Sequence, residues 1–357
     1  MELTDFYRGK RVFLTGHTGF KGSWLCVMLH EMGAKVSGLS IGIPTEVSMF
    51  EKLGLSDLLE EDARGDVTDA RKVREAMERA EPEIVIHLAA QPIVLRGYRE
   101  PLETLRTNIL GTACVLDGIR ELPSVRAALM VTTDKCYKNK GWIWGYREIE
   151  ELGGEDPYSC SKACAELVAG CYAGSFFSRG NCGIATARAG NVIGGGDWAE
   201  DRLVPDIVRA ARAGQSVALR HPEYIRPWQH VLEPLYGYLL LCRRLYDSGV
   251  EFAGPWNFGP AASQCASVGE IAGRLCSTLG CGLTCSDEAG QRESARLALD
   301  CTKAREQLGW SPVLSLDETL RLTADWYRSD AEGENMREKT REQLAWFWRR
   351  VRAAGET

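Results

Sequence analysis

The sequence contains no long hydrophobic run. No apolar stretch approaches the roughly 20 residues that a helix needs to cross a bilayer. The chain also lacks the charged segment, short apolar core and small-residue cleavage site that together mark a secretory leader. From these absences we expect a cytoplasmic protein that has no membrane partner.

Positive charge is also in short supply. The 43 Lys and Arg residues are outnumbered by 49 Asp and Glu residues, which gives a formal net charge of -6 at pH 7. Nucleic acids and anionic membranes attract proteins that carry an excess of positive charge. The composition therefore argues against both as main partners and favours small-molecule chemistry, although local basic clusters remain able to bind phosphate groups.

The 13 cysteines do not resemble a disulfide framework, because they are odd in number and spread through a long chain. Cys281 and Cys285 lack a second pair of ligands at the spacing of a zinc finger. Cys160, Cys164 and Cys171 recur at helical intervals that suit packing. We therefore predict reduced thiols and no metal site.

A glycine turn lies between a predicted strand and a predicted helix near the start of the chain. The apolar residues 10–15 run into Gly16, Gly19 and Gly22, and an amphipathic stretch covers residues 23–32. Glycines permit a tight turn, and the helix N-terminus that follows attracts the pyrophosphate of a dinucleotide. Gly33 then ends the helix and residues 35–40 form a second strand. Glycines also make ordinary turns, so the prediction of a dinucleotide site depends on the place of these glycines between a strand and a helix.

Strands and helices continue to alternate beyond this unit. We predict helices ending at residue 80 and spanning 101–120, strands over 83–88 and 127–131, and a charged amphipathic helical segment after Leu320. Such alternation predicts an α/β fold, a Rossmann-type doubly wound parallel sheet that binds ligands at the carboxyl ends of its strands. A chain of 357 residues is long for one such domain, so a smaller domain is expected as well. His87, within an apolar strand, is interpreted as a packed core residue.

Tyr158 and Lys162 are four residues apart, so on a helix they share a face and the ammonium lies near the phenol. A fixed cation favours the phenolate of a side chain that ordinarily ionises near pH 10, which makes Tyr158 a candidate base for an alcohol. Asp156 and Pro157, just before Tyr158, predict the start of this helix. The Tyr-x-x-x-Lys spacing is common by chance, so its value depends on the other motifs.

Ordered motifs along nearly the whole chain resemble the extended short-chain dehydrogenase/reductases, and within them the nucleotide-sugar 4,6-dehydratases. Thr-Asp-Lys-Cys-Tyr at 133–137, Gly-Gly-Gly-Asp-Trp at 194–198 and Arg-Pro-Trp-Gln-His at 226–230 are similar to the members that act on CDP-glucose. The remaining matches lie at residues 16–22, 87–92, 142–148, 156–159 and 188–193. The resemblance implies an NAD-binding domain over residues 1–190, with a returning strand and helix near 228–262, and a mainly nucleotide-sugar-binding domain over 191–357.

The resemblance also implies a reaction, a hydro-lyase (dehydratase) cycle with catalytic NAD. Tyr158 takes the proton of the sugar C4 hydroxyl as hydride moves from C4 to NAD, while Thr133 and Lys162 hold the reacting groups. The resulting 4-keto sugar loses its C5 proton and its C6 hydroxyl, with Asp134 as the acid. Hydride then returns to C6, so that the net change is loss of water.

Lys135 has two interpretations. The thymidine-sugar dehydratases carry Glu at the matching position, where a carboxylate is the easier base for the C5 proton. A lysine can serve if burial or a nearby cation keeps it neutral. Alternatively, Lys135 orients Asp134 or the sugar, and another group such as Tyr158 moves the C5 proton.

NAD is preferred over NADP, because no Arg or Lys closely follows the second strand to meet a 2′-phosphate. That strand ends at Ser40 without the acidic residue that usually binds the adenosine ribose. By resemblance, Asp66 and Val67 flank adenine, and residues 89–91 line the nicotinamide. The predicted cofactor-binding residues are Gly16, His17, Gly19, Phe20, Lys21, Gly22, Ser40, Asp66, Val67, Ala89, Ala90, Gln91, Asn108, Tyr158 and Lys162.

The nucleotide sugar is expected across the second domain. Arg226 offers a planar fork for the diphosphate, and Arg292 or Arg296 is able to share that charge. Trp198 is interpreted as packing its own loop. The predicted substrate-binding residues are Asn191, Arg202, Arg226, Trp228, His230, Arg292 and Arg296.

Two other functions stay open at this point. A nucleotide-sugar 4-epimerase would use Thr133, Tyr158 and Lys162 but has no need of Asp134, and a regulatory NAD-binding protein would typically lose Tyr158 or Lys162. The resemblance further implies a homodimer or tetramer that associates through helices near 101–120 and 158–177. It also implies a role in making deoxysugars for cell-surface polysaccharides such as the O-antigen of lipopolysaccharide.

Overall fold

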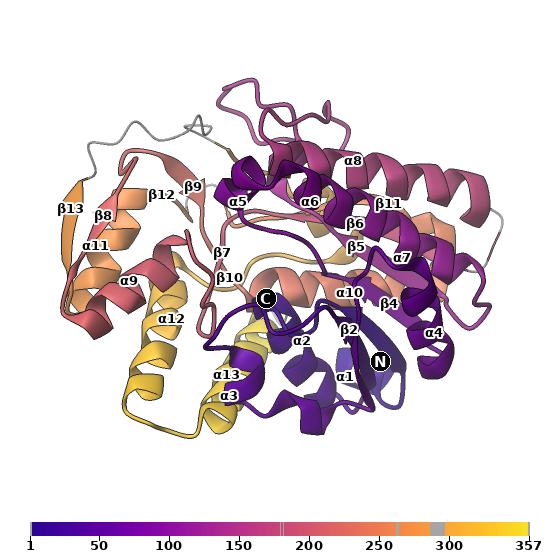
Figure 1. Ribbon diagram of the computed structural model, residues 1–357, viewed down its shortest axis with the longest axis horizontal. Coiled ribbons are helices and arrows are strands. Elements are labelled where there is room, and N and C mark those ends of the chain that lie inside the picture. Colours follow the sequence, from indigo (N-terminus) through magenta and orange to yellow (C-terminus); the bar gives the residue numbers. More distant parts are fainter. Residues whose placement is uncertain (1, 179, 181, 262–263, 286–296, 356–357) are drawn as a thin grey trace.

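A seven-stranded sheet forms the centre of the computed structural model, which describes residues 2–178, 180, 182–261, 264–285 and 297–355. Neighbouring strands are all parallel, in the order β11-β6-β5-β4-β1-β2-β3 (Figure 1). The strands are β1 (Arg11–Thr15), β2 (Lys35–Ser40), β3 (Glu61–Arg64), β4 (Ile84–His87), β5 (Ala127–Val131), β6 (Gly183–Ala189) and β11 (Gly254–Phe258). The predicted α/β fold with a parallel sheet is therefore confirmed.

Helices cover both faces of the sheet. In β5, Leu129 packs into one hydrophobic cluster and its neighbours Ala128 and Met130 into the other. Because both faces are buried, the strand is apolar at every position rather than at alternate ones. One face carries α4 (Ala70–Ala80), α7 (Gly111–Arg120) and α8 (Pro157–Tyr172), and the other carries α1 (Leu3–Tyr7), α2 (Phe20–Glu31) and α10 (Leu232–Ser248).

The segment predicted as one helix over residues 101–120 is not a uniform α-helix. It consists of α6 (Pro101–Leu105), a π-helical turn η2 (Arg106–Leu110) and α7. A second π-helical turn, η4 (Ala173–Phe177), extends α8. Turns of this kind often lie at functional sites, and η2 contains Asn108, which faces the sheet edge described below.

A smaller region follows the sheet toward the C-terminus (left of Figure 1). Its short strands pair two by two, as β7 with β10, β9 with β12, and β8 with β13. These strands are β7 (Val192–Ile193), β8 (Ser216–Leu219), β9 (Ile225–Pro227), β10 (Gln229–His230), β12 (Cys265–Ser267) and β13 (Gly282–Cys285). Its helices are α9 (Leu203–Ala213), α11 (Val268–Leu279), α12 (Leu316–Ala331) and α13 (Met336–Gly355).

The remaining short elements connect these parts. They are α3 (Met49–Lys52), η1 (Leu55–Leu58), α5 (Val94–Arg99), η3 (Asp134–Cys136), η5 (Gly249–Phe252) and η7 (Ala304–Leu308). Because β11 and α10 belong to the central sheet and its cover, the chain returns to the first unit after β7 to β10. The domain division near residue 190 stays a prediction.

Three local expectations differ from the structure. The helix after the glycine turn, α2, begins at Phe20 rather than at residue 23, so Gly22 lies within its first turn. The C-terminal helical segment is two helices, which turn at Gly333 with φ +76°. The strand β3 was not predicted at all, because Glu61–Arg64 has no run of apolar residues and lies at the edge of the sheet.

The described residues can be searched for disulfides, membrane-spanning helices and clusters of metal ligands. All 13 cysteines are free. None of the described helices is both long and apolar enough to cross a membrane. No three metal-ligating side chains of the described residues come together as a cluster.

Candidate active site

The glycine turn lies at the carboxyl end of β1, which is flanked in the sheet by β4 on one side and β2 on the other. Gly16 has φ +73°, and a Cβ there would lie 2.6 Å from the backbone nitrogen of Ala89. A Cβ on Gly22 would lie 2.3 Å from the carbonyl oxygen of Gly16. Both positions therefore require glycine. The turn and the N-terminus of α2, which has no side-chain cap, fit the pyrophosphate of a dinucleotide.

His17 fastens this turn to the neighbouring strands. Its ring is buried, with Nδ1 2.9 Å from Ser40 Oγ and Nε2 2.7 Å from Asp62 Oδ1. Burial lowers the pKa of His17, although the Asp62 carboxylate opposes this effect. Asp62 also pairs with Arg64, which lies opposite Ser40 in the register of β2 and β3. The sequence interpretation missed both residues, because it missed β3.

The predicted nicotinamide side is formed by the segment that follows β4. Gln91 N donates to Asn108 Oδ1 at 2.8 Å, and Asn108 Nδ2 donates to Ser161 Oγ at 2.8 Å. The side chain of Asn108 thus joins this segment to α8. His87 is buried between Thr15 and Thr112, and burial lowers its pKa to about 3, in keeping with a core residue. Asp66 accepts from Thr68 N and lies in the turn before α4.

Tyr158 enters the site from the first turn of α8, which is capped by Asp156 as the sequence predicts. Burial raises the pKa of Tyr158 to about 12, while a hydrogen bond with Thr133 and the charge of Arg202 lower it. Lys162 lies one turn further along and donates from Nζ to the carbonyl oxygen of Val131 at 3.1 Å. Burial lowers the pKa of Lys162 to about 8. The structure therefore brings Tyr158, Thr133 and Lys162 together at the end of β5.

Asp134 is fully buried beside these groups. Its Oδ1 accepts from Thr133 Oγ1 at 3.0 Å and from Lys135 Nζ at 3.4 Å, whereas Oδ2 has no partner among the described residues. Lys135 Nζ also donates to Asn191 Oδ1 at 3.4 Å. A buried carboxylate oxygen without a partner is costly unless a ligand or water satisfies it. Asp134 is consequently well suited to meet a polar group of a substrate.

Two further cations lie in this cluster. Lys21 lies in the first turn of α2, directly after the glycine turn. Burial together with the charges of Arg202, Lys162 and Lys135 lowers its pKa to about 7, while Asp134 raises it. Arg202 pairs with Asp197 at 2.9 Å. The sequence assigned Lys21 to the cofactor and Arg202 to the substrate, and the two cations lie close enough for their charges to interact. The signal for Lys21 was a charged residue inside a glycine turn.

Only some of the predicted substrate-binding residues lie beside Asp134. A Cβ on Gly190 would lie 3.1 Å from Asp134 Oδ2 and 2.9 Å from the ring of Pro227, so the segments that carry Asn191 and Arg226 border the site. Trp228 is buried and donates to the carbonyl oxygen of Ala266 at 3.1 Å.

His230 is fully buried, and burial lowers its pKa to about 3. Trp198 packs edge-on against Tyr327 of α12, and Arg212 lies 4.7 Å over its ring, so its contacts extend beyond its own loop. Arg226 is buried, and its guanidinium lies 5.2 Å from the ring of Tyr224. Arg292 and Arg296 lie outside the described residues.

Comparisons with known proteins agree with this geometry. A family model described as GDP-mannose 4,6 dehydratase matches residues 13–249. The CDP-glucose 4,6-dehydratase of Salmonella typhimurium is 48% identical over 339 residues, which cover 93% of this chain and 94% of the relative. The dTDP-glucose 4,6-dehydratase of Streptomyces antibioticus is 30% identical over 277 residues, 75% of this chain and 76% of the relative.

Solved structures share the fold. A double mutant of the dTDP-glucose 4,6-dehydratase of Streptomyces venezuelae, which has NAD bound, matches with a TM-score of 0.78 and 23% identity over 91% of this chain and 98% of that chain. The UDP-glucose 4-epimerase of Thermotoga maritima matches with a TM-score of 0.76 and 24% identity, covering 90% and 99% of the two chains. Since dehydratases and epimerases match equally well, these structures bear on the fold alone.

The buried ammonium of Lys162 predicts a pH-dependent cost to stability. Its pKa is about 8 in the folded chain and 10.5 ordinarily, so between these values the unfolded chain binds more protons and stability rises with pH. Below pH 8 both states carry the charge and the cost is fully present. Lys162→Met should therefore raise the free energy of unfolding at pH 7 by about 1 to 3 kcal/mol, with the gain vanishing near pH 10.5.

Urea denaturation at pH 7 and pH 10.5 measures this difference. Lys35→Met, which replaces an exposed lysine at the start of β2, is the matched control and should show no such change with pH. A Lys162→Met variant less stable than the parent chain at pH 7 would contradict the prediction.

Proposed function

We propose that this chain, which belongs to the GDP-mannose 4,6-dehydratase family, removes water from CDP-glucose to give CDP-4-keto-6-deoxyglucose. The observation that carries the proposal is the place of Asp134. Its Oδ1 accepts from Thr133, its charge acts on Tyr158, and its Oδ2 has no partner among the described residues, so one sugar is able to meet a base at C4 and an acid at C6. The 48% identity to a CDP-glucose 4,6-dehydratase supports the choice of base and sugar.

NAD is the cofactor that we propose for the glycine turn. When bound, it accepts hydride from C4 of the sugar and returns hydride to C6. Gly16 and Gly22 leave room for the pyrophosphate, and Asp62 neutralises the Arg64 guanidinium beside Ser40. An arginine so paired is poorly placed to bind the additional phosphate of NADP. NAD bound to a solved 4,6-dehydratase of the same fold also supports the proposal.

The residues then divide the chemistry between two segments. On α8, the Tyr158 phenolate, which the Lys162 ammonium stabilises, accepts the proton of the C4 hydroxyl and becomes the neutral phenol. In the segment after β5, Thr133 hydrogen-bonds the C4 oxygen, and the Asp134 carboxylate takes the proton of the Tyr158 phenol through Thr133. Tyr158 is then able to take the C5 proton as Asp134 gives its proton to the departing C6 hydroxyl, and Tyr158 returns the proton to C5 at the end. Burial raises the pKa of Tyr158 and disfavours its phenolate, and the hydrogen bond with Thr133 and the charge of Arg202 offset part of that cost.

Lys135 fits an orienting role. Its ammonium forms an ion pair with Asp134 and also contacts Asn191, so it ties the acid to the segment that borders the sugar. This contact fixes the direction in which the Asp134 carboxyl points.

The substrate is tested by incubating the protein and NAD separately with CDP-, UDP-, dTDP- and GDP-glucose and following each product by mass spectrometry. Loss of one water from CDP-glucose is expected, and deuterium placed at C4 should be recovered at C6. Tyr158→Phe is expected to abolish the reaction, because it removes the C4 base. A 4-epimer without loss of mass would make the protein an epimerase, and inertness toward all four sugars would favour a binding role.

The role of Lys135 is tested by two replacements. If Lys135 orients Asp134, Lys135→Arg keeps the ion pair and should retain turnover within about tenfold, whereas Lys135→Met should lose about 100-fold. Arginine does not deprotonate in proteins. A complete loss of activity in Lys135→Arg would therefore indicate that Lys135 is the base for the C5 proton.

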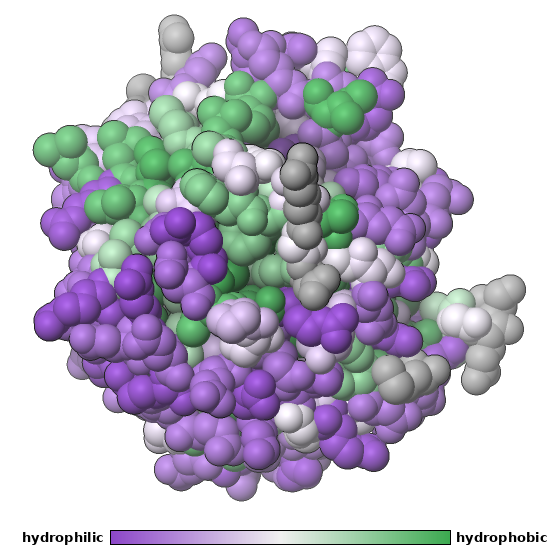
Figure 2. Space-filling model, turned by 90° about the vertical axis from the view of Figure 1, so that its right-hand side faces the viewer, coloured by the Kyte–Doolittle hydropathy of each residue, from purple (hydrophilic) through white to green (hydrophobic). Residues whose placement is uncertain are grey.

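A homodimer is the assembly that we propose. Apolar side chains gather on the side of the molecule where α7 and α8 lie (Figure 2). The exposed apolar residues on and near these helices are Tyr98, Leu102, Leu110, Leu167 and Phe176, with Leu167 62% exposed. Exposed apolar patches of this kind commonly mark protein interfaces, and a self-complementary patch closes as a dimer.

Light scattering after gel filtration measures this assembly. Leu167→Glu should convert the dimer to a monomer, because it would bury a charge at the contact. Val250→Glu, at an exposed apolar position on η5, is the matched control and should leave the mass unchanged. A monomeric parent chain, or a Leu167→Glu variant of unchanged mass, would remove this interface from consideration.

A further inference from the structure

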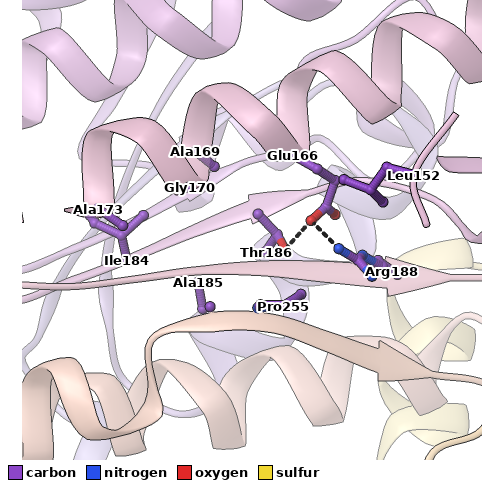
Figure 3. A pocket seen from close by; sticks show the side chains of 11 residues that line it. Leu152, Glu166, Ala169, Gly170, Ala173, Ile184, Ala185, Thr186, Arg188 and Pro255 are labelled. Atoms are coloured by element: carbon purple, nitrogen blue, oxygen red, sulfur yellow. Dashed lines mark hydrogen bonds and ion pairs between the residues drawn. The ribbon is translucent and has the colours of Figure 1, made fainter. Parts of the chain in front are cut away.

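Two charged side chains lie buried behind the catalytic helix and have no role in the chemistry above. Glu166 of α8 and Arg188 of β6 form an ion pair of 2.7 Å, and each side chain is 3% exposed. Figure 3 shows the pair at one end of a cavity of about 110 Å³ whose other walls, such as Ala169 and Ile184, are apolar. Burying two charges costs several kcal/mol that their attraction repays only in part, so stability alone is a poor reason for the pair.

Glu166 connects α8 to the end of β5. Its carboxylate accepts from the hydroxyl of Thr132 and from Thr186 Oγ1, the latter at 2.7 Å. Glu166 lies one helical turn after Lys162 and two turns after Tyr158, and Thr132 directly precedes Thr133. The carboxylate thereby holds the start of the catalytic segment against the helix that carries the base.

Arg188 holds the other end of the same segment. Its Nη1 donates to the hydroxyl of Tyr137 at 2.7 Å, and its guanidinium lies 4.8 Å from the Tyr137 ring. Tyr137 follows the turn η3 that contains Asp134 and Lys135, and its own hydroxyl donates to Asn257 Oδ1 at 2.7 Å. Residues 133–136 are therefore held at both ends, by the hydrogen bond from Thr132 to Glu166 and by that from Arg188 to Tyr137.

The charge of Glu166 also reaches the catalytic lysine. Burial lowers the pKa of Lys162, and the Glu166 carboxylate is the main group that opposes this effect. Arg188 in turn pairs with Glu166 at 2.7 Å, so each buried charge has a partner of opposite sign. The pair is connected to both halves of the proposed site.

We propose that Glu166 and Arg188 are positioning residues that set Asp134 in register with Tyr158. The inference rests on the proposed function, because loss of water requires an acid at C6 and a base at C4 on a single sugar ring. A displacement of about 1 Å between such groups costs about 100-fold in rate. The pair fixes this separation by joining α8, β6 and both ends of the segment after β5 in one buried network.

The test compares three variants in steady-state kinetics with NAD and the sugar nucleotide that the parent chain dehydrates. Glu166→Gln should lower kcat about 10- to 100-fold while KM stays within about threefold, and Tyr137→Phe, which leaves the ion pair intact, should lower kcat about tenfold. Tyr7→Phe is the matched control. It also removes a buried phenol hydrogen bond, from Tyr7 to the carbonyl oxygen of Leu239 at 2.9 Å, but far from the site, and its kcat should not change.

A purely structural role would give a different result. Glu166→Gln and Tyr137→Phe would then lower the melting temperature as Tyr7→Phe does, with kcat at 25 °C unchanged, and that outcome overturns the proposal. If Glu166→Gln does not fold, Tyr137→Phe decides the question, because it is the smaller change.

A second measurement separates this inference from the proposed function. Amide hydrogen exchange over residues 131–137, recorded without substrate, should be faster in Glu166→Gln than in the parent chain and unchanged in Tyr7→Phe. Faster exchange in a chain that dehydrates none of the sugars would leave the positioning role in place and reject the function. Unchanged exchange would reject the positioning role whatever the substrate.

Discussion

Because the seven strands run in one direction, their carboxyl ends meet at one edge of the sheet, and the segments that carry the chemistry leave it there. The glycine turn follows β1, Ser40 ends β2, and Thr132 follows β5. Residues more than 100 positions apart in sequence, such as Lys21 and Lys135, are brought into one electrostatic cluster by this geometry. Without the parallel sheet, the same motifs would be distributed over two sides of the molecule.

Burial at this edge sets the electrostatic character of the site. The side chains of Tyr158, Lys162 and Asp134 are nearly or fully withdrawn from water. Burial alone would keep the tyrosine protonated and the lysine neutral, which is the opposite of what proton abstraction requires. Surrounding charges oppose both effects, because Arg202 lowers the pKa of Tyr158 and Glu166 raises the pKa of Lys162. The cluster is therefore a set of mutually dependent charges rather than a list of independent residues.

Much of the fold was accessible from the sequence, for reasons that particular elements make plain. β1 and β5 are apolar runs, and α8 begins with Asp156 and Pro157, so strands and helix start were predicted with close bounds. β3 was missed because an edge strand need not be apolar. The π-helical turn η2 was missed because it depends on which backbone groups pair, a choice made by packing around Asn108 rather than by residue type.

The candidate site shows the same division. Tyr158 and Lys162 were found through their spacing, since helical geometry links residues four apart. The motif around Arg188 was noted in the sequence. The partner of Arg188, Glu166, lies 22 residues earlier on another element, so the ion pair could not be predicted from the sequence. Asp62 was missed for the same reason. Pairings between elements are a property of tertiary structure, and a single sequence without relatives contains no direct record of them.

The arrangement of α8 has a consequence for how freely its sequence can change. Its inner side carries Tyr158, Lys162 and Glu166, which we propose as base, partner and anchor, and its outer side carries Leu167 among the exposed apolar residues. The adjacent residues Glu166 and Leu167 thus face different sides of a helix only about 10 Å wide, one toward the protein interior and one toward the surface. If both proposals hold, this helix has no face on which substitutions can accumulate freely, and a shift by a single residue would misplace the proposed site and the proposed contact surface together.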